Sequence, residues 1–286
     1  MISLPEDLQL PKNDIDEFGT ITKRVLQYLP NVLSGYEDKN GYRLYTSRIA
    51  ENVKYTRPIN IRLFIYEESR FQKEFNRLKI IFKKIKSQED INETDKNIIN
   101  KTIYTIQQSI GVGRDLLVQL NSARKHVGNR FEELIKALFT ALGISNKRIV
   151  LKIPYETDEG TKTYKCENDL ILSPYSEVKS TPQTIDPKEI VVSAKTTSKD
   201  RMGKMFIDKL LLERFVGHPQ KVIGIFLNDV QRKDTNNISY TLVSGLFMVY
   251  SKFLTQLEGI YYLDPPPNAK KKPYSNHMKP FNGIIA

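Results

Sequence analysis

The stretch IVVSAKTTSKDR, residues 190–201, decides the fold. Its first half is a run of mostly β-branched and small apolar residues that ends on Lys195, which is typical of a buried strand. Upstream, ENDLIL at residues 167–172 is a second apolar strand, and Asp169 stands at its start. If the two strands are neighbours, the aspartate and the lysine lie at one edge of a sheet.

The segments around these strands alternate between helix and strand patterns. An apolar stripe predicts a helix over residues 128–142, and it ends at Gly143. The remaining segments are strands at 148–155, 163–172, 189–196, 222–228, 240–243 and 260–263, and helices at 200–215 and 247–257. This order indicates an α/β domain with a central mixed sheet flanked by helices.

The first part of the chain has mostly helical patterns. Apolar residues spaced by three and four predict a helix over residues 70–86, and a second helix is expected after Asn92, ending at Gly111 and Gly113. We therefore divide the chain into a mostly helical region, residues 1–115, an α/β core, residues 116–263, and a Pro/Lys-rich segment, residues 264–286. The last segment has no periodicity and is expected to be a flexible basic tail.

Composition limits the function. The 44 Lys and Arg residues against 33 Asp and Glu residues give a formal net charge of +11, which favours a polyanionic partner such as DNA. Cys166 is the single cysteine, which excludes an internal disulfide and a zinc site built from several cysteines and fits a cytoplasmic protein. No apolar run approaches the roughly 20 residues of a membrane helix, and no signal peptide is evident.

The predicted edge carries groups that suit phosphodiester hydrolysis. Carboxylates such as Asp169 can hold a hard divalent cation, and Mg²⁺ accepts one or two carboxylates together with water and phosphate oxygens. A lysine beside the metal, here Lys195, can orient the attacking water and offset the charge of the transition state. Glu132, on the predicted helix before the strands, could reach the same edge.

A more specific signal begins at Ser193. The sequence reads Ser-Ala-Lys-Thr-Thr, and the element Lys-Asp-Arg follows at residues 199–201. This run resembles the lysine strand of type II restriction endonucleases of the PD-(D/E)xK fold, in their EcoRII-like and CCGG-cutting branch. The resemblance covers roughly residues 123–227. It implies a restriction-endonuclease-like core, cleavage of double-stranded DNA, and Mg²⁺ as the cofactor.

The resemblance also implies roles for individual residues. Asp169 corresponds to the central metal ligand and Lys195 to the catalytic lysine. Glu132 corresponds to a helix carboxylate that helps to hold the metal or the water, and Glu133 is the competing choice. Ser193 occupies the middle position of the motif, where the family usually has a carboxylate, and is expected beside the metal ligands.

In this branch the missing carboxylate has moved onto the helix after the lysine strand. The corresponding residue is Asp208, where the family usually has Glu, and Glu213 is a weaker fallback. Asp is shorter than Glu by one methylene, so its reach toward a metal is reduced.

The element after the lysine reads CC:GG base pairs in this branch. Lys199 and Arg201 are expected to face guanines, and Asp200 is expected to accept from cytosine. Two alternatives remain: Asp200 caps the following helix, and Arg201 holds a backbone phosphate. Further phosphate contacts are expected from Arg124, Lys125 and Arg130, which lie just before and inside the predicted helix that bears Glu132.

These expectations describe a homodimeric type II restriction endonuclease, since a two-fold dimer suits a palindromic site. A cognate DNA methyltransferase is implied, because the host DNA would otherwise be cut. Two other functions remain open: a structure-selective or repair nuclease on the same fold, and a DNA-binding protein whose catalytic site has decayed.

Overall fold

A computed structural model describes residues 2–49, 52–117, 120–199, 201–234, 236–242 and 244–285. Within these ranges, residues 49, 52, 120–125 and 244 are described by their backbone alone. No helix in the described part of the chain is both long enough and apolar enough to cross a membrane.

The centre of the molecule is a six-stranded mixed sheet with the strand order β12-β11-β8-β7-β6-β5. The strands β5 (Ser145–Thr157), β6 (Gly160–Ser173) and β7 (Ile190–Lys195) pair antiparallel. From β7 onward the pairing is parallel, through β8 (Lys221–Phe226), β11 (Gly259–Tyr262) and β12 (Met278–Pro280). Consequently the carboxyl ends of β7, β8 and β11 meet at the edge where β6 passes Asp169.

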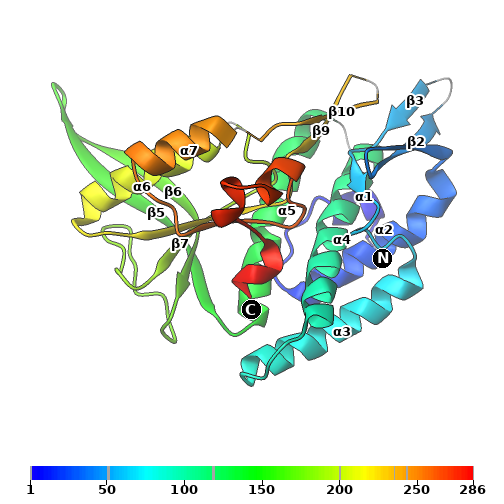
Figure 1. The fold of residues 1–286 in the computed structure, drawn as a ribbon, viewed down its shortest axis with the longest axis horizontal. Coiled ribbons are helices and arrows are strands. Elements are labelled where there is room, and N and C mark those ends of the chain that lie inside the picture. The colour runs from blue at the N-terminus through cyan, green and yellow to red at the C-terminus, as the bar shows by residue number, and fades with distance from the viewer. Residues whose placement is uncertain are drawn as a thin grey trace.

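Helices cover both faces of this sheet, as predicted for an α/β core. The helix α5 (Leu120–Ala141) packs on one face, and Phe131, Leu134 and Leu138 are buried in its apolar stripe. On the other face lie α6 (Met202–Val216) and α7 (Ser244–Phe253), which pack against each other through Phe206 and Phe247. Figure 1 shows α6 and α7 on one side of the sheet and α4 and α5 on the other.

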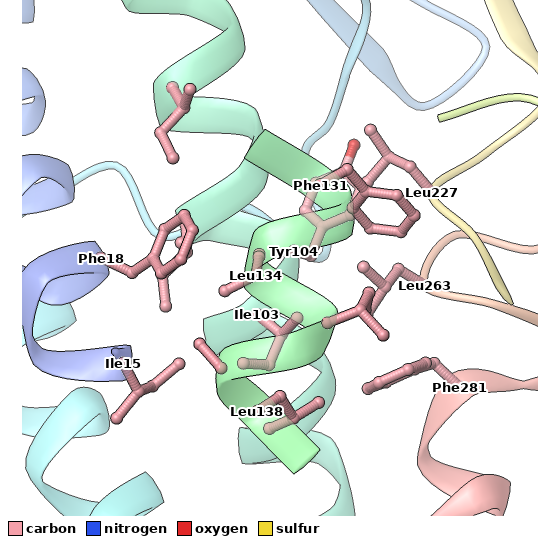
Figure 2. Packing of buried hydrophobic residues seen from close by; sticks show 14 of the residues in the cluster. Ile15, Phe18, Ile103, Tyr104, Phe131, Leu134, Leu138, Leu227, Leu263 and Phe281 are labelled. Carbon is pink, nitrogen blue, oxygen red and sulfur yellow. The ribbon is translucent and has the colours of Figure 1, made fainter. Parts of the chain in front are cut away.

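The N-terminal helices extend the core on the α5 side. They are α1 (Leu4–Asp7), α2 (Ile15–Val32), α3 (Glu68–Lys86) and α4 (Glu93–Leu117). Phe18 of α2, Ile103 of α4 and Leu134 of α5 belong to one buried cluster, which also takes in Leu263 and Phe281 (Figure 2). The helical region and the sheet therefore share one continuous hydrophobic core.

The N-terminal region also contains a small sheet that its sequence did not predict. Its strands are β1 (Gly35–Lys39), β2 (Tyr42–Ile49), β3 (Asn52–Tyr55) and β4 (Ile59–Asn60). A hairpin of β9 (Val230–Lys233) and β10 (Asn237–Tyr240) lies beside this sheet. Two hydrogen bonds join them: Lys39 Nζ donates to the carbonyl of Asn236 at 3.2 Å, and Asn236 Nδ2 donates to Glu37 at 2.9 Å.

The prediction of a flexible tail at residues 264–286 is wrong for the part that the structure describes. The segment forms three short 3₁₀ helices, η1 (Pro267–Lys270), η2 (Tyr274–Asn276) and η3 (Phe281–Ile284), and adds β12 to the sheet. Phe281 and Met278 are buried. The apolar groups among the prolines and lysines are too widely spaced to show a period, yet they fill the end of the core.

The prediction that Gly111 and Gly113 end a helix is also wrong, because α4 continues through both to Leu117. A Cβ atom on Gly111 would lie 2.4 Å from Nη1 of Arg57, and one on Gly113 would lie 3.0 Å from Cδ1 of Leu8. Both glycines thus allow other segments to approach the helix closely, which is a use of glycine that the sequence alone does not distinguish from a helix end.

Candidate active site

Asp169 lies on β6 beside the end of β7. Its Oδ2 accepts a hydrogen bond from the backbone amide of Ala194 at 3.0 Å and one from Ser193 Oγ at 3.4 Å, and its Oδ1 accepts one from Lys195 Nζ at 2.8 Å. The register places Leu170 opposite Val192, so the two strands bring these residues together directly. The sequence-based expectation that Asp169 and Lys195 share one sheet edge agrees with this geometry.

Glu132 reaches the same place from α5. Its neighbour Phe131 is fully buried, which fixes the rotation of the helix and turns Glu132 toward the sheet edge. Lys195 Nζ donates to Glu132 Oε1 at 2.6 Å. The side chains of Glu132, Asp169 and Lys195 are 21%, 11% and 27% exposed, so the group is sheltered yet accessible.

Burial and the neighbouring charges both shift the pKa of the Glu132 carboxyl. Burial raises the pKa of the Glu132 carboxyl, and the neighbouring Asp169 carboxylate raises it further. The Lys195 ammonium and the guanidinium of Arg148, on β5, act in the opposite direction. A carboxyl whose pKa is raised by burial and by a second carboxylate is typical of functional sites.

The donor set fits Mg²⁺. The oxygens of Asp169 and Glu132 converge on a single ammonium, and hard carboxylate oxygens are the ligands that Mg²⁺ prefers. Among the residues that the structure describes, no cluster of three or more His, Cys, Asp and Glu side chains could hold a metal. A cation here would therefore use two carboxylates and complete its coordination with water and phosphate oxygens, which is common for Mg²⁺.

The two alternative carboxylates hold other parts of the chain. Glu133 accepts a hydrogen bond from the amide of Lys12 at 3.0 Å and pairs with Arg130 at 2.7 Å. Glu213 accepts one from the amide of Gln220 at 3.0 Å, at the turn after α6. Neither contact involves Lys195, whereas Glu132 contacts it directly.

Asp208 lies on α6 and pairs with Lys204 one turn earlier. Its two oxygens accept from Lys204 Nζ at 2.7 and 2.6 Å. Cys166, which precedes Asp169 on β6, lies near Asp208. Burial raises the pKa of the Cys166 thiol, and the negative charge of Asp208 raises it further. Within the described residues, no hydrogen bond or ion pair joins Asp208 to Asp169, Glu132 or Lys195. The structure thus brings together three of the four proposed catalytic residues.

Lys199 and Arg201, the basic residues of the proposed base-reading element, are exposed, while Asp200 lies outside the described residues. The side chains of Arg124 and Lys125 also lie outside them. The expectation for Arg130 is corrected: it is 4% exposed and donates to the carbonyl of Leu10 at 2.6 Å, so it braces the N-terminal segment and cannot contact phosphate.

Asp229 is a site residue that sequence reasoning missed. It lies just after β8, is fully buried, and accepts hydrogen bonds from the segment that follows Lys195. The only signal for it in the sequence is an acidic residue at the end of an apolar strand, and that pattern is also typical of an ordinary turn.

The comparisons with known proteins concern the fold. No protein-family profile and no curated protein sequence matches the chain. The crystal structure of the type IIP restriction endonuclease Kpn2I matches with a TM-score of 0.72 and 18% sequence identity, over 95% of this chain and 89% of that chain. The restriction endonuclease PspGI in complex with substrate DNA matches with a TM-score of 0.46 and 13% identity, over 75% of this chain and 88% of that chain. The chain therefore has the predicted restriction-endonuclease-like fold, a mixed sheet between helices, and shares it over nearly its whole length with Kpn2I.

Proposed function

We propose that this protein is a type II restriction endonuclease that hydrolyses phosphodiester bonds of double-stranded DNA and depends on Mg²⁺. The observation that carries the proposal is the convergence of Asp169 and Glu132 on Lys195, at an accessible sheet edge of a fold shared with Kpn2I. The net charge of +11 supports a polyanionic substrate. A protein of this class would work in the cytoplasm beside a cognate methyltransferase.

In the proposed reaction, water attacks phosphorus in line and the bond to the 3′ oxygen breaks. Lys195 would orient the attacking water and offset the charge of the pentacovalent transition state through its ammonium. Asp169 fixes the position of that ammonium, and the amide of Ala194 and the hydroxyl of Ser193 fix the position of Asp169. Ser193 thus supports the carboxylate of Asp169.

Asp169 and Glu132, as the structure places them, would hold Mg²⁺. Asp208 would become a further ligand only by leaving its pair with Lys204. When bound, Mg²⁺ would supply Lewis-acid stabilisation of the phosphate and a more acidic water. The raised pKa of Glu132 fits this role, because a neighbouring cation would favour its charged form.

For recognition, we propose a site that contains CC:GG base pairs. Arg201 and Lys199 would contact guanine in the major groove, and Asp200 would accept from cytosine. Arg124 and Lys125 would contact phosphates. Two copies of the chain, related by a two-fold axis, would present one catalytic site to each strand of a palindromic sequence.

The test is digestion of a long, sequenced, unmethylated DNA by the purified protein, with Mg²⁺ and with EDTA, followed by sequencing of the ends. We expect discrete fragments that share one motif, with Mg²⁺ only. Cuts confined to junctions or damage would support the repair nuclease instead. Tight binding without any cutting would support the decayed site.

A further inference from the structure

Asp229 is the acceptor on which the segment after Lys195 converges. Its Oδ1 accepts hydrogen bonds from Thr197 Oγ1 at 2.9 Å and from the amide of Ser198 at 2.7 Å. Its Oδ2 accepts from Ser198 Oγ at 2.6 Å and from the hydroxyl of Tyr262 at 2.7 Å. Both Asp229 and Ser198 are fully buried. Burying a carboxylate costs free energy unless hydrogen-bond donors satisfy its oxygens. Asp229 accepts four hydrogen bonds, which offset that cost.

Backbone hydrogen bonds extend the same attachment toward the catalytic lysine. The amide of Leu227 donates to the carbonyl of Lys195 at 3.2 Å, and the amide of Asn228 donates to the carbonyl of Thr196 at 3.4 Å. The parallel pairing of β7 with β8 is thereby continued past the ends of both strands. Residues 195–198 are tied, one after another, to residues 227–229.

The attachment also sets where the next segment begins. The carbonyl of Ser198 accepts from the amides of Arg201 and Met202 at 3.0 and 2.9 Å, which starts α6. Lys199 and Arg201 project into solvent from this turn. Consequently the Asp229 carboxylate, together with these backbone hydrogen bonds, holds the segment that bears the exposed basic residues next to Lys195.

We propose that Asp229 is a positioning residue that sets the sequence discrimination of the enzyme by fixing residues 197–199 and, through the Ser198 carbonyl, Arg201 against the catalytic sheet edge. This inference rests on the proposed function, because discrimination is defined only for a protein that cuts. A purely stabilising residue would affect only the stability of the folded protein. The proposed role of Asp229 also affects which DNA sequences the protein cuts.

The chain provides a matched control in Glu189. Its side chain is also fully buried, and it accepts from the amides of Lys179 and Ser180 at 2.7 and 3.0 Å and from the Ser180 hydroxyl. Glu189 stands at the opposite end of β7, away from Lys195. Replacing either carboxylate by the amide removes a buried acceptor of the same kind, but only Asp229→Asn loosens the segment beside the lysine.

The experiment compares Asp229→Asn, Glu189→Gln and the parent protein, after the cut site has been found. The measured quantity is kcat/KM on that site divided by kcat/KM on sites with one base pair replaced. We expect this ratio to fall at least about tenfold in Asp229→Asn, which is within the range of one lost base contact. We expect it to be unchanged in Glu189→Gln, with melting temperatures lowered in both.

Ser198→Ala is a milder variant that removes one donor to Asp229 and serves if Asp229→Asn does not fold. It should lower the ratio in the same direction, and in the double variant the two losses should not add, because both act through one contact. If the discrimination ratio were unchanged in both Asp229→Asn and Ser198→Ala, this inference would be overturned while the proposed function would stand. The same would follow if the ratio fell as much in Glu189→Gln as in Asp229→Asn. Absence of cutting by the parent protein would overturn the proposed function and this inference with it.

Discussion

The backbone amide of Ala194 donates a hydrogen bond to the carboxylate of Asp169 at 3.0 Å, across the pair formed by β6 and β7. Ala194 is itself buried, so its methyl group faces the core while its amide faces the site. The carboxylate proposed to bind the metal is therefore held by the same backbone that presents Lys195 one residue later.

Asp169→Asn and Asp169→Ala should both abolish cutting. We expect a loss of at least about a thousandfold, since catalytic groups that act as a unit show losses of this size or more. Binding to DNA should persist, because the proposed phosphate contacts come from other residues. Digestion and gel-shift assays on the same DNA measure the two effects. Loss of binding together with cutting in Asp169→Asn, which retains an acceptor for Ala194, would indicate a structural role instead.

Glu132→Gln and Glu133→Gln form a matched pair on adjacent positions of α5. Glu132→Gln should lower kcat by about ten- to a hundredfold, because it removes a charge that faces Lys195. Glu133→Gln should leave kcat unchanged but lower the free energy of unfolding by about 1–3 kcal/mol, because it removes the charge partner of the buried Arg130. Steady-state kinetics and urea unfolding distinguish them. If Glu133→Gln lost activity and Glu132→Gln did not, Glu133 would be the working carboxylate in place of Glu132.

Asp208→Ala tests the fourth proposed catalytic residue. Its pair with Lys204 is a partly exposed contact within one helix, and such pairs contribute only about 0.3–0.5 kcal/mol, so the carboxylate can leave it. We expect Asp208→Ala to lower cutting at least about tenfold with little change in melting temperature, and Lys204→Ala to leave cutting unchanged. Activity of Asp208→Ala equal to that of the parent would restrict the metal ligands to Asp169 and Glu132.

Asp264→Asn should change how stability depends on pH. Burial raises the pKa of the Asp264 carboxyl to about 6, although Asn60 Nδ2 donates to it at 2.8 Å. Because the unfolded pKa is about 3.9, the folded form binds more protons between about pH 4 and 6. The free energy of unfolding should therefore fall by about 2–3 kcal/mol as the pH rises through this interval.

Asparagine does not titrate and can still accept from Asn60, so Asp264→Asn should remove that fall. Urea unfolding of both proteins at several pH values between 4 and 8 measures it. Asp38→Asn is a control of the opposite sign, because hydrogen bonds from Arg43 lower the pKa of Asp38 and its contribution is lost on acidification. Parallel curves for Asp264→Asn and the parent would contradict the assignment.

The strands of the catalytic core could be predicted because each has a local pattern. The predicted segments 148–155 and 163–172 lie within β5 and β6, and 189–196 exceeds β7 by one residue at each end; β-branched residues bounded by polar residues identify all three without knowledge of their partners. Asp169 and Lys195 could be paired in advance because Lys195 ends its strand and Asp169 stands where the apolar part of β6 begins. Their contact with Glu132 depends on how α5 is rotated, which Phe131 and Leu134 fix.

The features that the sequence did not reveal depend on contacts between distant segments. In the small N-terminal sheet the strands β1, β3 and β4 are only five, four and two residues long, and β12 adds to the large sheet through three residues only. Asp229 was missed because its four donors come from Thr197, Ser198 and Tyr262, which are far from it in the sequence. Arg130 was misassigned because a basic residue at the start of a helix has the same pattern whether it faces solvent or the N-terminal segment.

The pairing of β6 with β7 also has a consequence for how the molecule acquires activity. Glu132, Asp169 and Lys195 come from three elements that are widely separated along the chain, and they meet only when the antiparallel pair and the packing of α5 are complete. Long-range contacts of this kind form late, because the loops between them must close first. A newly made or partly folded chain accordingly lacks the assembled site, so under the proposed function only molecules that have finished folding would cut DNA.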